Sequence, residues 1–182
     1  ALDAGAAGIQ VGTLFAYCDE SGITPEIKRS VLASVVDGTA EVRTDFRASP
    51  TGFPFKVVDW AEDPYPASER KRICDLGYLR QPYKASDGKT RYRCASEPID
   101  QYVKKEGDLE QTTGRKCLCN GLLGTIGQGQ ARTDNTVGAE PPLVTSGDEL
   151  VRMAPFLNGR THYSAADVVE YLTSRVRAMA MA

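Results

Sequence analysis

A glycine and a threonine near the start of the chain have the chemistry needed to bind a phosphate group. Residues 8–13 form a short apolar run, and its last four residues are Gln10, Val11, Gly12 and Thr13. Glycine has no Cβ, so a ligand can approach its backbone closely, and the amides of Gly12 and Thr13 together with the Thr13 hydroxyl are donors to an anion. We therefore predict that these four residues bind a phosphate, although the same dipeptide at the end of a strand also marks simple turns.

Four of the five cysteines lie between residues 74 and 119, and their number suits a metal site. Four thiolates are the ligand set of tetrahedral zinc and of iron–sulfur clusters. The spacing argues against a metal site, because the sequence has no Cys-x-x-Cys pair and Cys117 and Cys119 are separated by only one residue, which is unusually close for two ligands of one ion. Three uses therefore stay open: a shared zinc or iron–sulfur site, buried structural thiols, and disulfides. The four residues are Cys74, Cys94, Cys117 and Cys119.

Other side chains with catalytic chemistry fit structural roles better. His162 is the only histidine, and it precedes Ser164 and Asp167. We expect that serine and aspartate to cap a helix N-terminus rather than to form a Ser-His-Asp site, and we expect His162 at the start of a helix or on the surface. Cys18 follows the apolar run, and we expect it to line the core or the site rather than to serve as a fifth metal ligand.

The composition excludes several classes of function. With 182 residues, of which 41% are hydrophobic and 25% charged, the chain has the profile of a globular protein. Lys and Arg number 22 against 24 Asp and Glu, so the net charge of -2 creates no field that attracts nucleic acid or anionic membranes. The longest uncharged stretch near the start, residues 4–18, is too short and glycine-rich to cross a bilayer. Five cysteines, an odd number, favour intracellular thiols or metal ligands over a secreted disulfide framework. We therefore expect a soluble, cytoplasmic protein.

The candidate phosphate-binding residues lie in a predicted strand between two helices. Residues 2–6 have the pattern of the last turn of a helix, and residues 7–15 form an uncharged run typical of a buried parallel strand. Thr24 and Pro25 then begin an amphipathic helix over residues 25–37, which a glycine follows. The end of a helix, a buried strand and a second helix make one α/β repeat.

The rest of the chain predicts less regular structure. Residues 39–72 are expected to form an ordered connecting loop, because aromatic residues recur along it, and only residues 55–60 resemble a strand. Residues 73–182 are expected to form a loop-rich, cysteine-containing extension that ends in helices. The last helix has its caps at Ser164 and Asp167, followed by an apolar stripe on one face.

Several stretches carry a resemblance to a family of flavoenzymes. Residues 4–15 are similar to the eighth barrel strand of the FMN-dependent nitronate monooxygenases, formerly called 2-nitropropane dioxygenases. Residues 48–56, 74–80 and 117–122 resemble the long C-terminal extension of one bacterial branch of that family. The resemblance implies an α/β fold in which residues 1–38 supply the end of helix 7, strand 8 and helix 8 of a (β/α)8 TIM barrel. In such barrels the phosphate commonly sits on the loops after the last two strands.

The same resemblance implies an activity and a cofactor. Members of the family oxidise an alkyl nitronate with FMN and dioxygen to a carbonyl compound and nitrite, and the backbone that matches residues 10–13 holds the flavin phosphate. The family's catalytic histidine and its other flavin-binding segments match nothing in this sequence. We therefore expect them in an N-terminal remainder of the barrel before Ala1, with no catalytic residue in this chain and no activity from the chain alone.

Two other interpretations stay open. The chain is also consistent with a metal-stabilised structural or interaction module without catalysis, centred on residues 73–130. The flavin-dependent enoyl-acyl-carrier-protein reductases resemble the same predicted strand but not the cysteine-containing extension.

Overall fold

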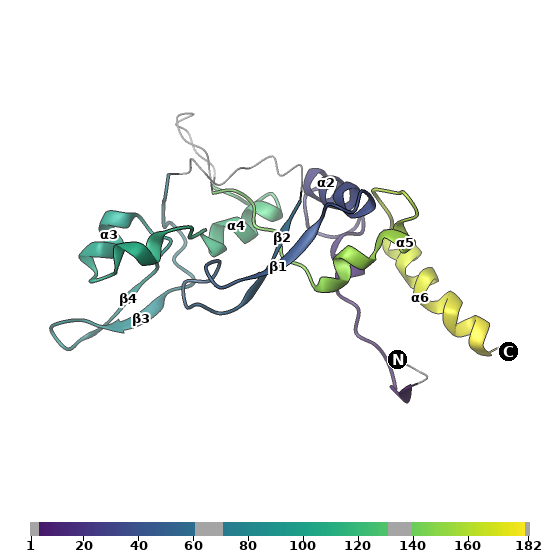
Figure 1. The fold of residues 1–182 in the computed structure, drawn as a ribbon, viewed down its shortest axis with the longest axis horizontal. Coiled ribbons are helices and arrows are strands. Elements are labelled where there is room, and N and C mark those ends of the chain that lie inside the picture. The colour runs from purple at the N-terminus through teal and green to yellow at the C-terminus, as the bar shows by residue number, and fades with distance from the viewer. Residues whose placement is uncertain (1–3, 61–70, 131–139, 181–182) are drawn as a thin grey trace. The chain divides into compact units, whose positions relative to one another are not determined.

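The structure is a computed structural model that describes residues 4–60, 71–130 and 140–180, with side chains described up to residue 174. The chain has a mixed α/β fold of short helices and two-stranded sheets (Figure 1). It divides into two compact units. Within the described residues, the first unit contains residues 4–42, 60 and 146–180, and the second contains residues 43–59, 71–130 and 140–145.

Helix α2, Pro25–Val36, is a central element of the first unit. Thr24 precedes it in an extended conformation, and Pro25 occupies the first helical position, where a missing amide proton costs nothing. Gly38 follows the helix with φ +72°, a left-handed conformation that glycine adopts without strain. The helix predicted over residues 25–37 is therefore confirmed. Its apolar side chains at positions 27, 31, 32 and 35 are buried.

The first unit closes with a 3₁₀ helix and two α-helices. These are η4, Asp148–Arg152, α5, Ala154–Leu157, and α6, Ala165–Ala180. Helix α2 packs against η4 and α5. Before α6, the Asp167 carboxylate accepts hydrogen bonds from the Ser164 amide and hydroxyl, both at 2.7 Å, and the Asp167 amide donates to Ser164 Oγ at 3.2 Å. The predicted caps are confirmed, and each satisfies a backbone group that the helix leaves unpaired.

Residues 7–15 do not form the strand that the sequence predicts. The chain is irregular through Gly12, and α1, Thr13–Ala16, is a single helical turn closed by the Ala16 amide on the Gly12 carbonyl at 2.9 Å. A strand is stable only when a neighbouring strand pairs with its backbone. Among the described residues no strand pairs with this segment, so its apolar character does not produce one. The predicted helix end at residues 2–6 lies partly outside the described residues.

A buried lysine holds the turn that follows α1. Lys28 Nζ donates hydrogen bonds to the carbonyl oxygens of Cys18 and Asp19, both at 2.9 Å, and of Ser21, at 3.2 Å. The residue is only 5% exposed. The three carbonyl oxygens therefore replace the water that a buried ammonium loses.

The second unit contains two strand pairs. Strand β1, Glu41–Asp45, enters this unit at residue 43 and pairs with β2, Phe55–Asp59, so the strand predicted near residues 55–60 is confirmed. Arg43 bridges the carboxylates of Asp45 and Asp59. The Val58 amide donates to the Val144 carbonyl at 3.0 Å. A small core lies beside β2, where Ala48, Val57, Leu118 and Leu143 are buried together.

The second strand pair is a β-hairpin. Strand β3, Gln81–Lys84, runs antiparallel to β4, Thr90–Arg93, with Gln81 opposite Arg93. Among the described residues of this unit, the other regular elements are three short helices, namely α3, Ile99–Lys104, the 3₁₀ helix η3, Leu109–Thr112, and α4, Leu118–Thr125. Figure 1 shows the hairpin beside α3.

Arginines connect the loops of the second unit through backbone carbonyls. Arg72 donates to the carbonyls of residues 95 and 112, at 3.2 and 2.7 Å. Arg115 donates to the carbonyl of Ser49 at 2.7 Å. Arg93 donates to the carbonyls of residues 105 and 106, and its guanidinium stacks over the ring of Tyr83, 4.4 Å from the centroid. These bonds link segments that no shared sheet or long helix connects.

Within the described part of the chain, every helix is too short or too polar to cross a membrane.

Candidate functional site

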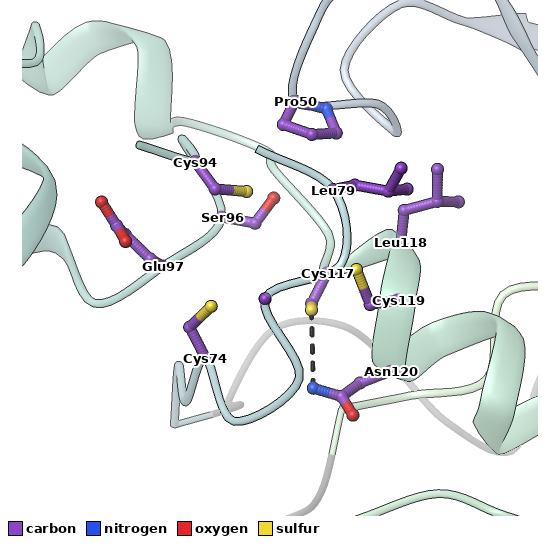
Figure 2. Close-up of a pocket in the computed structure, with 11 residues that line it drawn as sticks. Pro50, Cys74, Leu79, Cys94, Ser96, Glu97, Cys117, Leu118, Cys119 and Asn120 are labelled. Atoms are coloured by element: carbon purple, nitrogen blue, oxygen red, sulfur yellow. Dashed lines mark hydrogen bonds between the residues drawn. The ribbon is translucent and has the colours of Figure 1, made fainter. Parts of the chain in front are cut away.

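The four cysteines between residues 74 and 119 line one small pocket of the second unit (Figure 2). Cys74 lies in the loop before β3, and Cys94 follows β4 directly. Cys117 is the N-cap residue of α4, and Cys119 lies in its first turn. Three segments that are separate in the sequence thus bring their thiols to one place. The pocket has a volume of about 10 Å³, which is about the size of one water molecule.

Polar groups around the pocket donate hydrogen bonds to the sulfur atoms. The Ser96 backbone bonds to Cys94, and the backbones of Tyr78 and Leu79 bond to Cys119. The Asn120 backbone bonds to Cys117, and its side-chain Nδ2 lies 3.6 Å from Cys117 Sγ, as the dashed line in Figure 2 shows. Hydrogen bonds of this kind favour the charged form of a thiol.

Two of the thiols form an asymmetric pair. A hydrogen bond from Cys117 lowers the pKa of Cys119 to about 6, with further help from the backbones of Leu79 and Tyr78 and against the effect of burial. The same bond and burial raise the pKa of Cys117 well above its usual range. Burial also raises the pKa values of Cys74 and Cys94. Cys117 is therefore the hydrogen-bond donor of the pair, and Cys119 is the more acidic of the two thiols.

The structure narrows the three uses predicted for these cysteines. All five cysteines of the chain are free thiols, so none of the disulfides is formed. Among the residues that the structure describes, no three Cys, His, Asp or Glu side chains are arranged as ligands of one ion. The structure thus brings together the four residues that the sequence singled out, as thiols around a shared pocket.

Hydrogen bonds also tie together the loops that carry the cysteines. Asn120 Nδ2 donates to Asp75 Oδ1 at 2.7 Å, which connects α4 to the loop of Cys74. Ser96 Oγ donates to the Lys116 carbonyl at 2.5 Å, which connects the loop after Cys94 to the residue before Cys117. The Cys117 amide donates to the buried carboxylate of Glu140 at 2.7 Å. These polar contacts hold together the loops that carry the thiols.

The residues predicted to bind phosphate line a second pocket, which lies in the first unit. Gln10, Val11, Gly12 and Thr13 form one side of it together with Leu14. The pocket has a volume of about 390 Å³, which lies in the range of small-molecule sites. A Cβ built on Gly12 would meet no protein atom within 4 Å, so the backbone here is open to an approaching group.

The other side of this pocket comes from the C-terminal elements. Glu149 and Arg152 of η4 contribute to it, and their side chains form an exposed ion pair of 3.3 Å. Phe156 of α5 and Tyr171 of α6 add aromatic surface. Sequence reasoning did not find Arg152. The signal was weak, because a single arginine in a polar segment far along the chain does not reveal that it lines the same pocket as Thr13.

The remaining candidates take the structural positions expected of them. The His162 side chain is 72% exposed, and its Nδ1 lies 3.6 Å from Asp19 Oδ2. It lies just before α6, so it is a surface residue at the start of a helix, while Ser164 and Asp167 serve as caps. Cys18 is buried in the core of the first unit, 3% exposed, with its Sγ 3.2 Å from the Phe15 carbonyl.

Comparison of the chain with protein-family models, with curated proteins and with solved structures finds no match to any of them.

Proposed function

We propose that the chain is the C-terminal part of an FMN-dependent oxidoreductase of the nitronate monooxygenase kind, and that the pocket beside residues 10–13 receives the phosphate end of FMN. The observation that carries this proposal is that Gln10, Val11, Gly12 and Thr13 all line one pocket of about 390 Å³. The resemblance of residues 4–15 to a flavin-binding barrel strand supports it independently of the structure.

The residues around this pocket fit a phosphate. The open backbone at Gly12 gives an oxygen atom access to main-chain amides, and Thr13 begins a helical turn, so its amide has no acceptor within the helix. Gly147 lies close to the Thr13 hydroxyl, because a Cβ there would come within 3.3 Å of Thr13 Oγ1. Arg152 lines the same pocket, where it pairs with Glu149, and a guanidinium also pairs well with phosphate oxygens.

In this proposal the chain's own residues bind and orient the cofactor and exclude water. Bound FMN supplies the redox chemistry with dioxygen that converts a nitronate to a carbonyl compound and nitrite. Phe156 and Tyr171 give the pocket an apolar side that shields the phosphate-binding backbone. In this proposal, proton abstraction is assigned to residues outside this chain.

The test uses the protein encoded by the whole reading frame that contains this chain. We expect Gly12→Leu to weaken FMN retention about tenfold, because the new side chain fills the space that the phosphate occupies. Gly8→Leu is the matched control, since a Cβ at Gly8 also meets no protein atom within 4 Å and Gly8 does not line the pocket. The measurement is flavin content after dialysis.

Riboflavin separates phosphate recognition from recognition of the flavin ring. We expect riboflavin, which lacks the phosphate, to bind the parent protein and its Gly12→Leu variant with similar affinity. Equal FMN retention by the Gly12→Leu and Gly8→Leu variants would contradict the proposal, as would a reading frame that begins near Ala1 and encodes no preceding strand–helix repeats.

A further inference from the structure

We propose that Cys74, Cys94, Cys117 and Cys119 bind one structural zinc ion that holds the loops of the second unit together. Their thiols come from three segments and line one pocket, in which Cys117 and Cys119 lie together and Cys74 and Cys94 lie across from them (Figure 2). This inference does not depend on the flavin proposal, because the two pockets belong to different units.

The size of the pocket matches a single ion. Its volume of about 10 Å³ leaves room for one water-sized atom and for no organic ligand. Zinc prefers four ligands in a tetrahedral arrangement with Zn–S distances of about 2.3 Å. No three of these thiols stand in ligand geometry in the described residues, so binding requires the sulfur atoms to move toward one centre as each thiol loses its proton. The four cysteines supply a complete ligand set, which is typical of structural zinc rather than of a catalytic site with an open position.

The surroundings of the sulfurs have the features of a ligand environment. Backbone groups of residues 78, 79, 96 and 120 already bond to three of the four sulfurs. Asn120 joins the Cys117 sulfur to Asp75, the neighbour of Cys74. Contacts of this kind orient metal ligands and balance their negative charge. Buried thiols that only fill a core do not need them.

A buried carboxylate beside the cysteines gives a second, independent observation. Glu97 lines the same pocket and is 3% exposed. Its Oε2 accepts a hydrogen bond from Lys105 Nζ at 2.6 Å, whereas its Oε1 has no hydrogen-bond partner among the described residues. A buried carboxylate oxygen left unpaired is costly. Glu97 Oε1 thus adds an unpaired anionic oxygen to the lining, which attracts the cation but also faces the net negative charge of a four-thiolate zinc site.

The short elements of the second unit are a further reason to expect a stabilising metal ion. The helices around the pocket are short, since α3 has six residues and α4 has eight, and the paired strands have four or five residues each. Short elements bury little apolar surface, so small loop-rich folds are commonly stabilised by a metal. Zinc at these four cysteines joins the loop before β3, the end of β4 and the start of α4.

The first experiment is metal analysis of the 182-residue chain, produced in zinc-containing medium and purified without chelator. We expect about one zinc ion per chain. Cys74→Ser and Cys94→Ser should each lose stoichiometric zinc. Cys18→Ser is the matched control, because Cys18 is also a buried free thiol but lies in the other unit, and it should keep the full zinc content.

A second experiment on the unaltered chain guards against variants that fail to fold. Titrating the thiols with a mercurial reagent should release zinc in proportion to the four thiols that react. Replacement of zinc by Co²⁺ should give the intense visible and near-ultraviolet bands of tetrahedral cobalt–thiolate coordination. Asn120→Ala, which removes a contact to a ligand and no ligand itself, should weaken zinc binding about tenfold.

Three results would overturn the proposal. The first is a purified chain that contains no zinc and takes up neither Zn²⁺ nor Co²⁺. The second is iron together with acid-labile sulfide, which would identify an iron–sulfur cluster at these cysteines. The third is an unchanged zinc content in both the Cys74→Ser and the Cys94→Ser variant, which would place the metal elsewhere.

Discussion

Tyr163 donates a hydrogen bond from its hydroxyl to the backbone carbonyl of Leu14 at 2.6 Å. The two residues are far apart in the sequence, and the contact joins the segment before α6 to the helical turn beside the proposed phosphate pocket. Tyr163 is 1% exposed, and burial raises the pKa of its hydroxyl well above the usual range, so it remains a donor at every physiological pH. The position of the pocket wall therefore depends on this contact.

Tyr163→Phe removes the hydroxyl and leaves the carbonyl of the half-buried Leu14 without this partner. We expect the free energy of unfolding of the first unit to fall by about 1–3 kcal/mol. Urea denaturation followed by the fluorescence of Trp60, the only tryptophan and a buried residue of the first unit, measures the change. Tyr92→Phe, at an exposed tyrosine of the second unit, is the control and should leave this transition unchanged. An equal, small effect of both substitutions would show that the Tyr163 contact contributes no stability.

Lys28→Met tests the buried ammonium of α2. The substitution keeps an unbranched side chain that is one atom shorter, but leaves the carbonyls of residues 18, 19 and 21 without their shared donor. Because hydrogen bonds to a charged group are strong, we expect a loss of about 3 kcal/mol or more. The neighbouring Arg29 is exposed, so Arg29→Met is a matched control with little expected effect. Trp60 fluorescence again reports the transition, and a stable Lys28→Met variant would contradict the role assigned to Lys28.

Gly121→Ala tests how closely α4 packs in the second unit. A Cβ at this position would lie 2.8 Å from Leu143 Cβ and 3.4 Å from the Pro141 carbonyl, so the helix or the segment beside it must move. We expect a loss of about 1–3 kcal/mol, although alanine favours a helix over glycine by about 1 kcal/mol. Gly124→Ala is the control in the same helix, since its Cβ meets no atom closer than 3.4 Å. Denaturation followed by far-ultraviolet circular dichroism compares the two, and equal stability of both variants would contradict the prediction.

The pKa values of two carboxylates, Asp45 and Asp75, determine how the stability of the second unit should change in acid. Burial alone would raise the pKa of Asp45, but hydrogen bonds from Arg43 and the Arg47 backbone outweigh it and lower the pKa. The pKa of Asp75 is lowered in the same way. Burial would raise it, but hydrogen bonds from Asn120 and Gln130 outweigh the effect of burial. A carboxylate with a lowered pKa in the folded state stabilises the fold above its unfolded pKa of about 3.9. That contribution is lost as the pH falls through the folded pKa.

We therefore expect the thermal stability of the second unit to decrease as the pH falls below about 4. Replacing Asp45 and Asp75 by asparagine should flatten this dependence, whereas Asp100→Asn, at an exposed helix position, should not. Hydrogen exchange of residues 71–130 between pH 5 and pH 3 measures the effect. A pH dependence that persists unchanged in the Asp45→Asn, Asp75→Asn double variant would assign it to other groups.

The sequence predicts the elements whose signals are local. Helices α2 and α6 are marked by Pro25 and by the Ser164 and Asp167 caps, and such signals act within one turn of the chain. Strands depend on partners that lie elsewhere. The apolar residues 7–15 predict a strand that no neighbour supports, and the polar β1 was not predicted because its pairing involves Arg43 and a carboxylate on another strand.

The candidate sites, too, could be predicted from the sequence only in part. The residue types at positions 10–13 and the number of cysteines indicate binding chemistry without any structure. That Cys74 and Cys94 meet the pair on α4 follows only from the path of the loops, which spacing does not reveal. Arg152 was missed for the same reason, since its place in the same pocket as Thr13 depends on how η4 packs in the first unit.

The arginines that donate to backbone carbonyls in the second unit have a consequence for how the sequence can diverge. Every residue type carries the same carbonyl, so the loops that accept from Arg72, Arg93 and Arg115 can exchange their side chains without losing these bonds. The donors are not exchangeable in this way, because the compact ammonium of a lysine does not reproduce the planar, fixed fork of N–H donors that a guanidinium presents. In related chains, substitutions should therefore accumulate in the accepting loops, while the three arginines and the path of the backbone between them persist.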